Sequence, residues 1–121
     1  MSITQIAGKF FVPRQKELEK HFSQPEELQH RVLARLMAAA ADTEYGRDHL
    51  FGSVNNYEQF AANCPVNSYE DLKDFIDRMR HGESDVLWKG KVRWYAKSSG
   101  TTNDKSKFIP VSADGLKDTH Y

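Results

Sequence analysis

The stretch YAKSSGTTNDKSKFIPVS, residues 95–112, joins two runs of strand-forming residues through a polar loop. The first run, KVRWYAKSS at 91–99, is rich in Val, Trp and Tyr, and the second, KFIPV at 107–111, has Phe, Ile and Val. β-Branched and aromatic side chains favour the extended, half-buried backbone of a strand. We therefore predict two short strands, and Pro110 indicates an edge position or a strand end for the second.

The loop between these strands has the composition of an anion-binding turn. Backbone N–H groups in a loop rich in Gly, Ser and Thr can point toward one centre and bind phosphate. Gly100 allows close approach of the backbone, and Lys107 offers a charge-assisted hydrogen bond. Neither common phosphate loop fits, because the Walker and dinucleotide patterns both require a glycine at position 105, where Lys105 stands. A flexible polar hairpin loop is the alternative from composition alone.

The residues upstream of the strands predict helices. Apolar residues at helical spacing predict one helix from about Pro25 to Ala41, with Ser23 as its N-cap. A short helix over 57–63 is predicted behind Asn55 or Asn56, whereas residues 42–56, which contain two glycines, are predicted to form a loop.

A further helix is predicted after Ser68. Asp71 stands in the capping-box position, and Gly82 suits the residue just past the helix end. Four apolar residues at i, i+3, i+4 and i+7 predict a core-facing stripe: Leu72, Phe75, Ile76 and Met79. A last helix is predicted to start at Ser112.

The order of these elements indicates an α/β fold. Residues 1–85 are predicted to be mainly helical, 86–112 to form strand, loop and strand, and 113–121 to begin a helix. Two strands alone make a marginal sheet, so we expect an N-terminal part of one larger α/β domain in a longer polypeptide.

Composition and charge narrow the class of ligand. The chain has 17 basic and 17 acidic residues, yet six basic residues and one acidic residue lie between Lys89 and Lys107. This local excess predicts an anionic ligand at the loop. Cys64 is the only cysteine, and neither a signal peptide nor an apolar run of membrane length is present, so we expect a cytoplasmic location.

A specific resemblance supports the phosphate-loop interpretation. Ser98, Ser99, Gly100, Thr101 and Thr102 resemble, in order, the first ATP-binding motif of the adenylate-forming superfamily. Lys107 and Pro110 correspond to its lysine and proline, and Asn103 stands where many members have glycine. Residues 28 to 115 resemble one branch of that superfamily, the Gretchen Hagen type acyl-acid–amido synthetases of the auxin-responsive promoter family. The resemblance is carried, in order, by TEYGRDHLF, by CPVNSYEDLKDFIDRMRHGESDVLW and by the loop.

The resemblance implies a luciferase-like α/β domain and a two-step ligase reaction. A carboxylic acid would be adenylated with Mg-ATP, and an amino acid or another amine would then receive the acyl group. The loop residues, Ser98, Ser99, Gly100, Thr101, Thr102 and Asn103, would hold the β- and γ-phosphates, and Lys107 would be the catalytic cation. The adenine pocket, the acyl pocket and the acidic residue near Mg²⁺ are expected beyond Tyr121, so the 121 residues alone are expected to be inactive.

Other classes of function remain as alternatives. Trp88, Trp94 and Tyr95 interleave with basic residues, as in a binder of single-stranded nucleic acid. A helical interaction domain without a ligand is a third class. We expect neither nucleic acid nor a membrane as partner, and the five histidines lack metal-site spacing, so no metal site is predicted. Glu83 and Asp85 could form a carboxylate pair or a solvated surface.

Overall fold

The computed structural model describes residues 22–98 and 106–119, together with residues 8, 9, 12, 13, 15, 16, 18 and 19. The chain divides into two compact units, Met1–Leu33 and Ala34–Tyr121. In the first unit, helix α2 (Pro25–Ala40) begins after Gln24, whose carbonyl accepts the Leu28 N–H at 3.1 Å. The start of α2 at Pro25 agrees with the predicted helix, and the N-cap at Ser23 stays a prediction.

The elements after α2 follow the predicted order, with one exception. They are α3 (Glu44–Asp48), the 3-10 helix η1 (Phe51–Ser53), α4 (Tyr57–Asn63), α5 (Tyr69–Arg80), β1 (Trp94–Lys97), β2 (Phe108–Val111) and α6 (Ala113–Thr119). The helices predicted over 25–41, over 57–63 and after Ser68 and Ser112 are confirmed. The prediction of a loop over 42–56 is wrong, because α3 and η1 lie within it.

Helix α3 forms because the residues before it and within it fit one tight turn. The buried Thr43 hydroxyl accepts the Gly46 N–H at 2.9 Å and donates to the Ala40 carbonyl at 2.7 Å. A Cβ on Gly46 would lie 1.9 Å from that same carbonyl oxygen, so only glycine fits. Gly46 therefore permits a close turn between α2 and α3, although glycine usually indicates a loop.

Helix α5 is capped at both ends as the sequence predicts. The Asp71 carboxylate accepts the Ser68 backbone N–H at 2.7 Å, and the Ser68 hydroxyl caps the Asp71 N–H. The Ser68 hydrogen bonds hold the pKa of Asp71 below its ordinary value. At the other end Gly82 adopts a left-handed φ of 100° and donates its N–H to the Met79 carbonyl.

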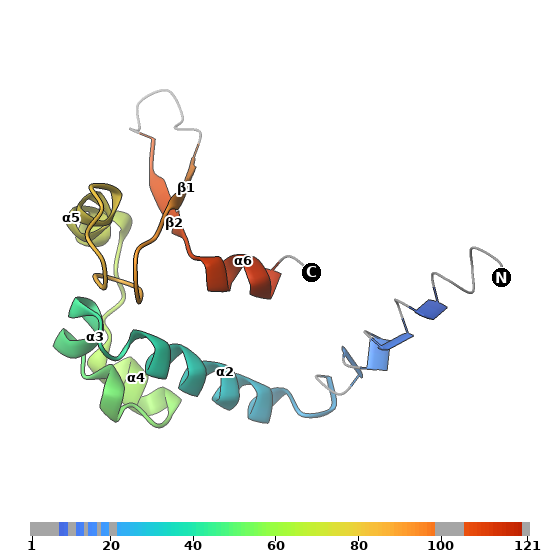
Figure 1. Ribbon diagram of the computed structural model, residues 1–121. Helices are drawn as coiled ribbons and strands as arrows, with labels where there is room; N and C mark the ends of the chain where they lie inside the picture. The colour runs from blue at the N-terminus through green and yellow to red at the C-terminus, as the bar shows by residue number, and fades with distance from the viewer. Residues whose placement is uncertain are drawn as a thin grey trace. The chain divides into compact units, whose positions relative to one another are not determined.

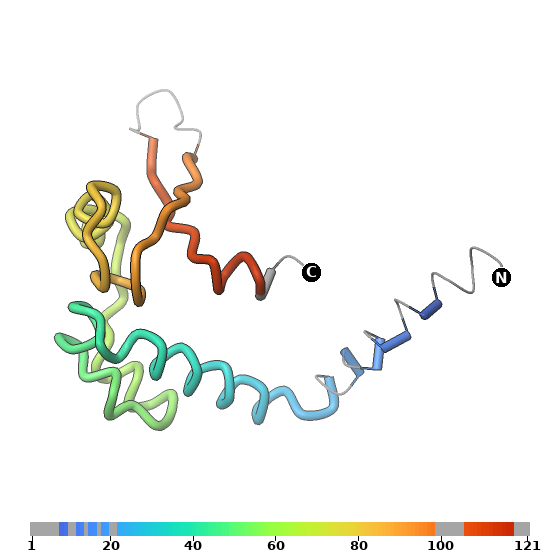
Figure 2. The backbone as a smooth tube through the Cα atoms, in the orientation of Figure 1, coloured from blue at the N-terminus to red at the C-terminus, as the bar shows by residue number. Residues whose placement is uncertain are grey.

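The core lies where α5 meets the segment that leads to β1. We call α3, α5 and residues 81–93 together the helical corner. Met79, Val86 and Val92 are its buried centre. The backbone passes from α5 through residues 81–93 into β1 (Figure 2). The first turn of α3 is fastened there, because Asp85 and Val86 carbonyls accept the N–H groups of Glu44 and Tyr45.

Strands β1 and β2 pair antiparallel in a two-stranded sheet among the described residues. The register pairs Trp94 with Val111 and Lys97 with Phe108. Helix α5 lies beside this hairpin, and α6 follows the C-terminal end of β2 (Figure 1). Within the described part of the chain, no helix combines the length and the apolar character needed to cross a membrane.

Candidate phosphate-binding hairpin

The hairpin is closed by Ser98 and Lys107, the first and last of the predicted site residues. The Ser98 N–H donates to the Lys107 carbonyl at 2.9 Å, and the Lys107 N–H donates to the Ser98 hydroxyl oxygen at 3.1 Å. The structure thus brings these two residues together across the stem. The other predicted phosphate ligands, Ser99, Gly100, Thr101, Thr102 and Asn103, lie outside the described residues.

In its contact with Lys107, the Ser98 hydroxyl acts as an acceptor. A hydroxyl carries one O–H donor besides its acceptor lone pairs, so Ser98 keeps a proton with which to donate to an anion. Its side chain is exposed, as a ligand-binding hydroxyl requires. Ser98 can therefore hold the stem and contact a phosphate oxygen at the same time.

The strand that follows the loop is held by α5. The Phe108 backbone N–H donates to the Tyr69 hydroxyl at 3.0 Å. The Arg80 guanidinium lies over the Phe108 ring, 3.6 Å from its centroid. Neither Tyr69 nor Arg80 was predicted as part of the site. Their only sequence signal is a separation of 11 residues, which places them on one helix face, about 20° apart at 100° per residue.

The Lys107 side chain also contacts α5. Its ammonium nitrogen lies 5.5 Å from the centroid of the Tyr69 ring. A cation at this distance over an aromatic face is attracted by the negative face of the ring. Lys107 is therefore attached at its side chain as well as at its backbone.

The aromatic residues near the hairpin serve mainly in packing. Trp88 and Tyr95 are partly buried against the core of the helical corner. The Trp88 indole N–H points to the Asp114 carboxylate at 3.4 Å, and burial raises the pKa of Tyr95. Trp94 is 53% exposed. Because two of the three rings are occupied in packing, they do not form the shared stacking surface that binding of single-stranded nucleic acid requires.

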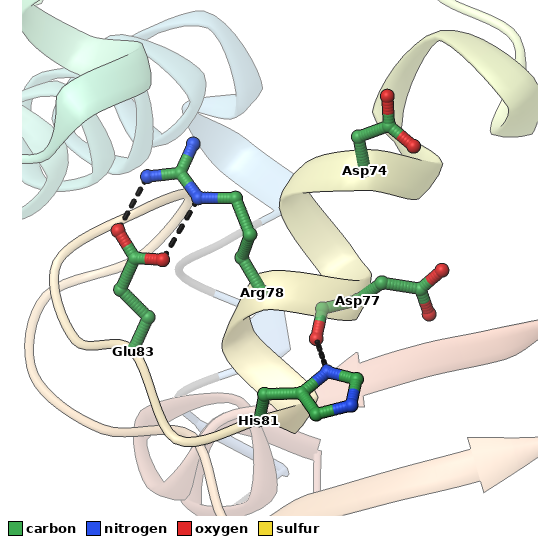
Figure 3. Close-up of a pocket in the computed structure, with 5 residues that line it drawn as sticks. All are labelled: Asp74, Asp77, Arg78, His81 and Glu83. Carbon is green, nitrogen blue, oxygen red and sulfur yellow. Dashed lines mark hydrogen bonds and ion pairs between the residues drawn. The ribbon is translucent and has the colours of Figure 1, made fainter.

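An open hollow of about 430 Å³ on the C-terminal half of α5 is poorly suited to an anion. Figure 3 shows its lining residues: Asp74, Asp77, Arg78, His81 and Glu83. The Arg78 guanidinium is paired with the Glu83 carboxylate, and the His81 Nδ1 bonds to the Asp77 backbone carbonyl (Figure 3). Three carboxylates and one paired guanidinium would repel a triphosphate.

Arg78 also pairs with one acidic residue before α5 and one after it. Its guanidinium bonds the Glu44 carboxylate at 2.9 Å as well as Glu83. These bonds lower the pKa of both carboxyls and raise the pKa of Arg78. Asp85 has a different role, because its carboxylate accepts the Gly90 N–H at 2.6 Å. Glu83 and Asp85 are thus separate structural groups, and the carboxylate-pair alternative is not supported.

The comparisons with known proteins establish the family. The family described as "GH3 family N-terminal domain" matches residues 14–121 of this chain. The chain therefore belongs to the GH3 family, as its resemblance to the auxin-responsive promoter branch predicts.

Curated relatives of this chain are plant amido synthetases and ligases. "Indole-3-acetic acid-amido synthetase GH3.15" from Arabidopsis thaliana is 35% identical over 101 residues, which is 83% of this chain and 17% of that protein. "4-substituted benzoates-glutamate ligase GH3.12" from the same plant is 32% identical over 97 residues, covering 79% of this chain and 17% of that protein. The chain spans less than a fifth of the length of these relatives.

Solved structures confirm the fold class. "GH3.15 acyl acid amido synthetase" matches with a TM-score of 0.76 and 31% identity, over 86% of this chain and 19% of that one. A structure of the same protein "in complex with 2,4-DB" gives a TM-score of 0.76 and 30% identity, over 87% and 18%. Helices leading into a small sheet are thus a part of a larger, known architecture, as predicted.

Proposed function

We propose that this chain forms the phosphate-binding part of an ATP-dependent acyl-acid amido synthetase. Membership of the GH3 family and the printed names of the relatives support this class of reaction. The observation that carries the proposal is the closed stem, in which the Ser98 hydroxyl and the Lys107 backbone meet at the base of the Ser/Thr-rich loop.

The proposed reaction joins a carboxylic acid to an amino acid or another amine. A carboxylate oxygen attacks the α-phosphorus of ATP and releases pyrophosphate, and the amine nitrogen then attacks the acyl carbon, displaces AMP and loses a proton. Transfer of this kind depends chiefly on positioning and on neutralising charge at the phosphates. A protein nucleophile is therefore not needed in this part of the chain.

The hairpin residues divide this work between neutral donors and one cation. Ser98 donates its remaining hydroxyl proton to a phosphate oxygen, and Lys107 provides the positive charge. Ser99, Gly100, Thr101, Thr102 and Asn103 provide further N–H and hydroxyl donors in the proposal. Among the described residues, no three His, Cys, Asp or Glu side chains gather as a metal site. Mg²⁺ would enter with the phosphate oxygens of ATP, and the acidic residue near it is expected beyond Tyr121.

We also propose that the protein works in the cytoplasm. Cys64 is a free thiol and is the only cysteine in the sequence. Its hydroxyl neighbour Tyr45 lies 3.7 Å from the sulfur, and burial, followed by the Cys64 contact, raises the pKa of that Tyr45 hydroxyl. A half-buried thiol that is free in this chain is suited to a reducing compartment.

Exchange of radiolabelled pyrophosphate into ATP tests this function. The assay uses the polypeptide at its full natural length, a panel of carboxylic acids, and the variants Lys107→Ala and Lys73→Ala. Lys73 is the matched control, because it removes the same charge from the exposed surface of α5, where it pairs with Glu70 at 3.9 Å.

The expected result is acid-dependent exchange that falls by about 100-fold in Lys107→Ala, as for loss of one charged transition-state contact, and stays unchanged in Lys73→Ala. Absence of exchange with every acid would contradict the proposal. Binding of single-stranded nucleic acid that weakens steeply with salt would support the alternative class instead.

A further inference from the structure

The outer edge of β2 presents one backbone N–H next to the loop lysine, and Tyr69 binds it. In an antiparallel pair, residues alternate between facing the partner strand and facing away. Because Ser98 and Lys107 bond to each other across the stem, the next residue, Phe108, directs its N–H away from β1. That N–H donates to the Tyr69 hydroxyl at 3.0 Å.

The same tyrosine contacts the residue on the loop side. Its ring faces the Lys107 ammonium at 5.5 Å, while its hydroxyl binds the backbone of the following residue. One side chain thus contacts both the backbone at the start of β2 and the side chain of Lys107.

Tyr69 is itself firmly placed. It is the first residue of α5 and directly follows Ser68, which forms the capping box with Asp71. At the far end of the same helix face, Arg80 covers the Phe108 ring at 3.6 Å. The stem is therefore attached to both ends of a capped helix, and the helix packs into the core through Ile76 and Met79.

We propose that Tyr69 is a positioning residue for Lys107. Its ring presets the lysine ammonium for the triphosphate of ATP. This proposal rests on the function proposed above. A cation over a half-buried tyrosine ring such as that of Tyr69 is held more weakly than one bonded to a phosphate. The ring therefore keeps the ammonium beside the stem before ATP binds and releases it when phosphate oxygens arrive. The hydroxyl keeps the backbone of the stem in place throughout.

The experiment compares two tyrosines that occupy the same local position. Tyr69→Phe removes the hydroxyl and keeps the ring, and Tyr69→Leu removes both. Tyr57 is the matched control, because it is also the first residue of a helix behind a capping residue, Asn56, and it is 66% exposed. Tyr57→Phe and Tyr57→Leu are made in the same full-length polypeptide.

Three measurements separate positioning from folding. They are equilibrium binding of Mg-ATP by calorimetry, the split of pyrophosphate-exchange kinetics into kcat and KM for ATP, and hydrogen exchange of the β2 amides followed by mass spectrometry. Loss of one hydrogen bond in Tyr69→Phe is expected to raise the Kd and the KM for ATP about fivefold and to speed exchange at β2, with kcat little changed. Tyr69→Leu is expected to lower kcat as well, by about tenfold, since the lysine loses its ring contact.

Each outcome decides the proposal. If Tyr69→Phe speeds amide exchange at β2 yet binds Mg-ATP as tightly as Tyr57→Phe does, then Tyr69 is only a structural residue and the inference is wrong. If the wild-type protein neither binds Mg-ATP nor catalyses exchange, the proposed function is wrong, and the inference about Tyr69 is wrong as well. If Tyr69→Leu does not fold, the comparison of Tyr69→Phe with Tyr57→Phe decides alone.

Discussion

The helical corner and the β1–β2 hairpin are stabilised by different kinds of interaction. The corner has a buried centre, Met79, Val86 and Val92, each at most 5% exposed. In the hairpin, none of the strand residues is fully buried, and Trp94 and Ile109 are about half exposed. The corner is stabilised by burial of apolar surface, whereas the hairpin depends on hydrogen bonds and on its contacts with α5.

This difference assigns separate tasks to the two regions. A buried core supplies stability without exposing reactive groups, and an exposed hairpin can offer hydroxyls and a lysine to a ligand. The link between them is α5, whose apolar face packs into the corner while Tyr69 and Arg80 contact β2. Changes at the buried centre of the corner should therefore alter folding, and changes in the hairpin, or at Tyr69 where α5 contacts it, should alter binding.

The largest effect is expected from Gly46→Ala in the corner. The new Cβ would lie 1.9 Å from the Ala40 carbonyl oxygen, so α2 and α3 must move apart. We expect a loss of at least about 4 kcal/mol in the free energy of unfolding, measured by urea denaturation. Gly52→Ala is the control, because its Cβ would have Ala41 as nearest neighbour at an ordinary 3.8 Å. Equal stability of the two variants would show that the corner is not tightly packed.

A matched pair of truncations compares the two regions directly. Met79 is 2% exposed in the corner, and Ile109 is 47% exposed in β2. Met79→Ala is expected to cost about 3 kcal/mol in the free energy of unfolding because it leaves a cavity. Ile109→Ala is expected to cost less than about 1 kcal/mol, since its side chain is half in water. The same denaturation series measures both, and a larger loss for Ile109→Ala would reverse the assignment of the core.

The capping box tests the element that connects the regions. Ser68→Ala removes the hydroxyl that caps Asp71, and it is expected to cost about 1 kcal/mol in the free energy of unfolding. Ser68→Thr keeps a hydroxyl at the same position and should restore most of that loss. If Ser68→Ala lowers the free energy of Mg-ATP binding by more than it lowers the free energy of unfolding, the cap contributes to the placement of Tyr69. No loss in either variant would exclude a role for the cap.

The smallest effect concerns the pH dependence of the corner. Arg78 holds the pKa of Glu44 and of Glu83 below the ordinary 4.5. A carboxyl whose pKa is lowered on folding adds stability above its unfolded pKa, and that stability is lost as the pH falls through its folded pKa. Thermal unfolding between about pH 5 and pH 3 should therefore show a steeper loss in wild type than in Arg78→Gln. Arg31→Gln, on the exposed surface of α2, should keep the wild-type slope.

Local signals in the sequence predicted most of the helices and the hairpin. The Ser68–Asp71 capping box, the apolar stripe through Met79 and the left-handed Gly82 depend on residues at most seven positions apart, so they can be read without a tertiary structure. The short α3 was missed, because five residues around Gly46 give no periodicity, and its turn is fixed by contacts with Ala40 and Val86.

The candidate site was only partly predictable for a related reason. Ser98 and Lys107 could be chosen because they belong to one contiguous motif, and the structure brings them together. Tyr69 bonds to a residue 39 positions away, and Arg78 bonds to Glu44 across 34 positions. Pairings of this length are set by packing of the helical corner, and neither residue type at either end indicates its partner.

Pro110 has a consequence for how the outer edge of β2 can meet another strand. It faces Tyr95 in the register, two residues beyond Phe108, so both residues turn their backbone nitrogens to the outer edge of β2. The nitrogen of Phe108 is occupied by Tyr69, and the nitrogen of Pro110 carries no hydrogen. An incoming strand from another molecule would find no N–H donor at either position, so this edge resists the strand-to-strand association by which exposed sheets aggregate.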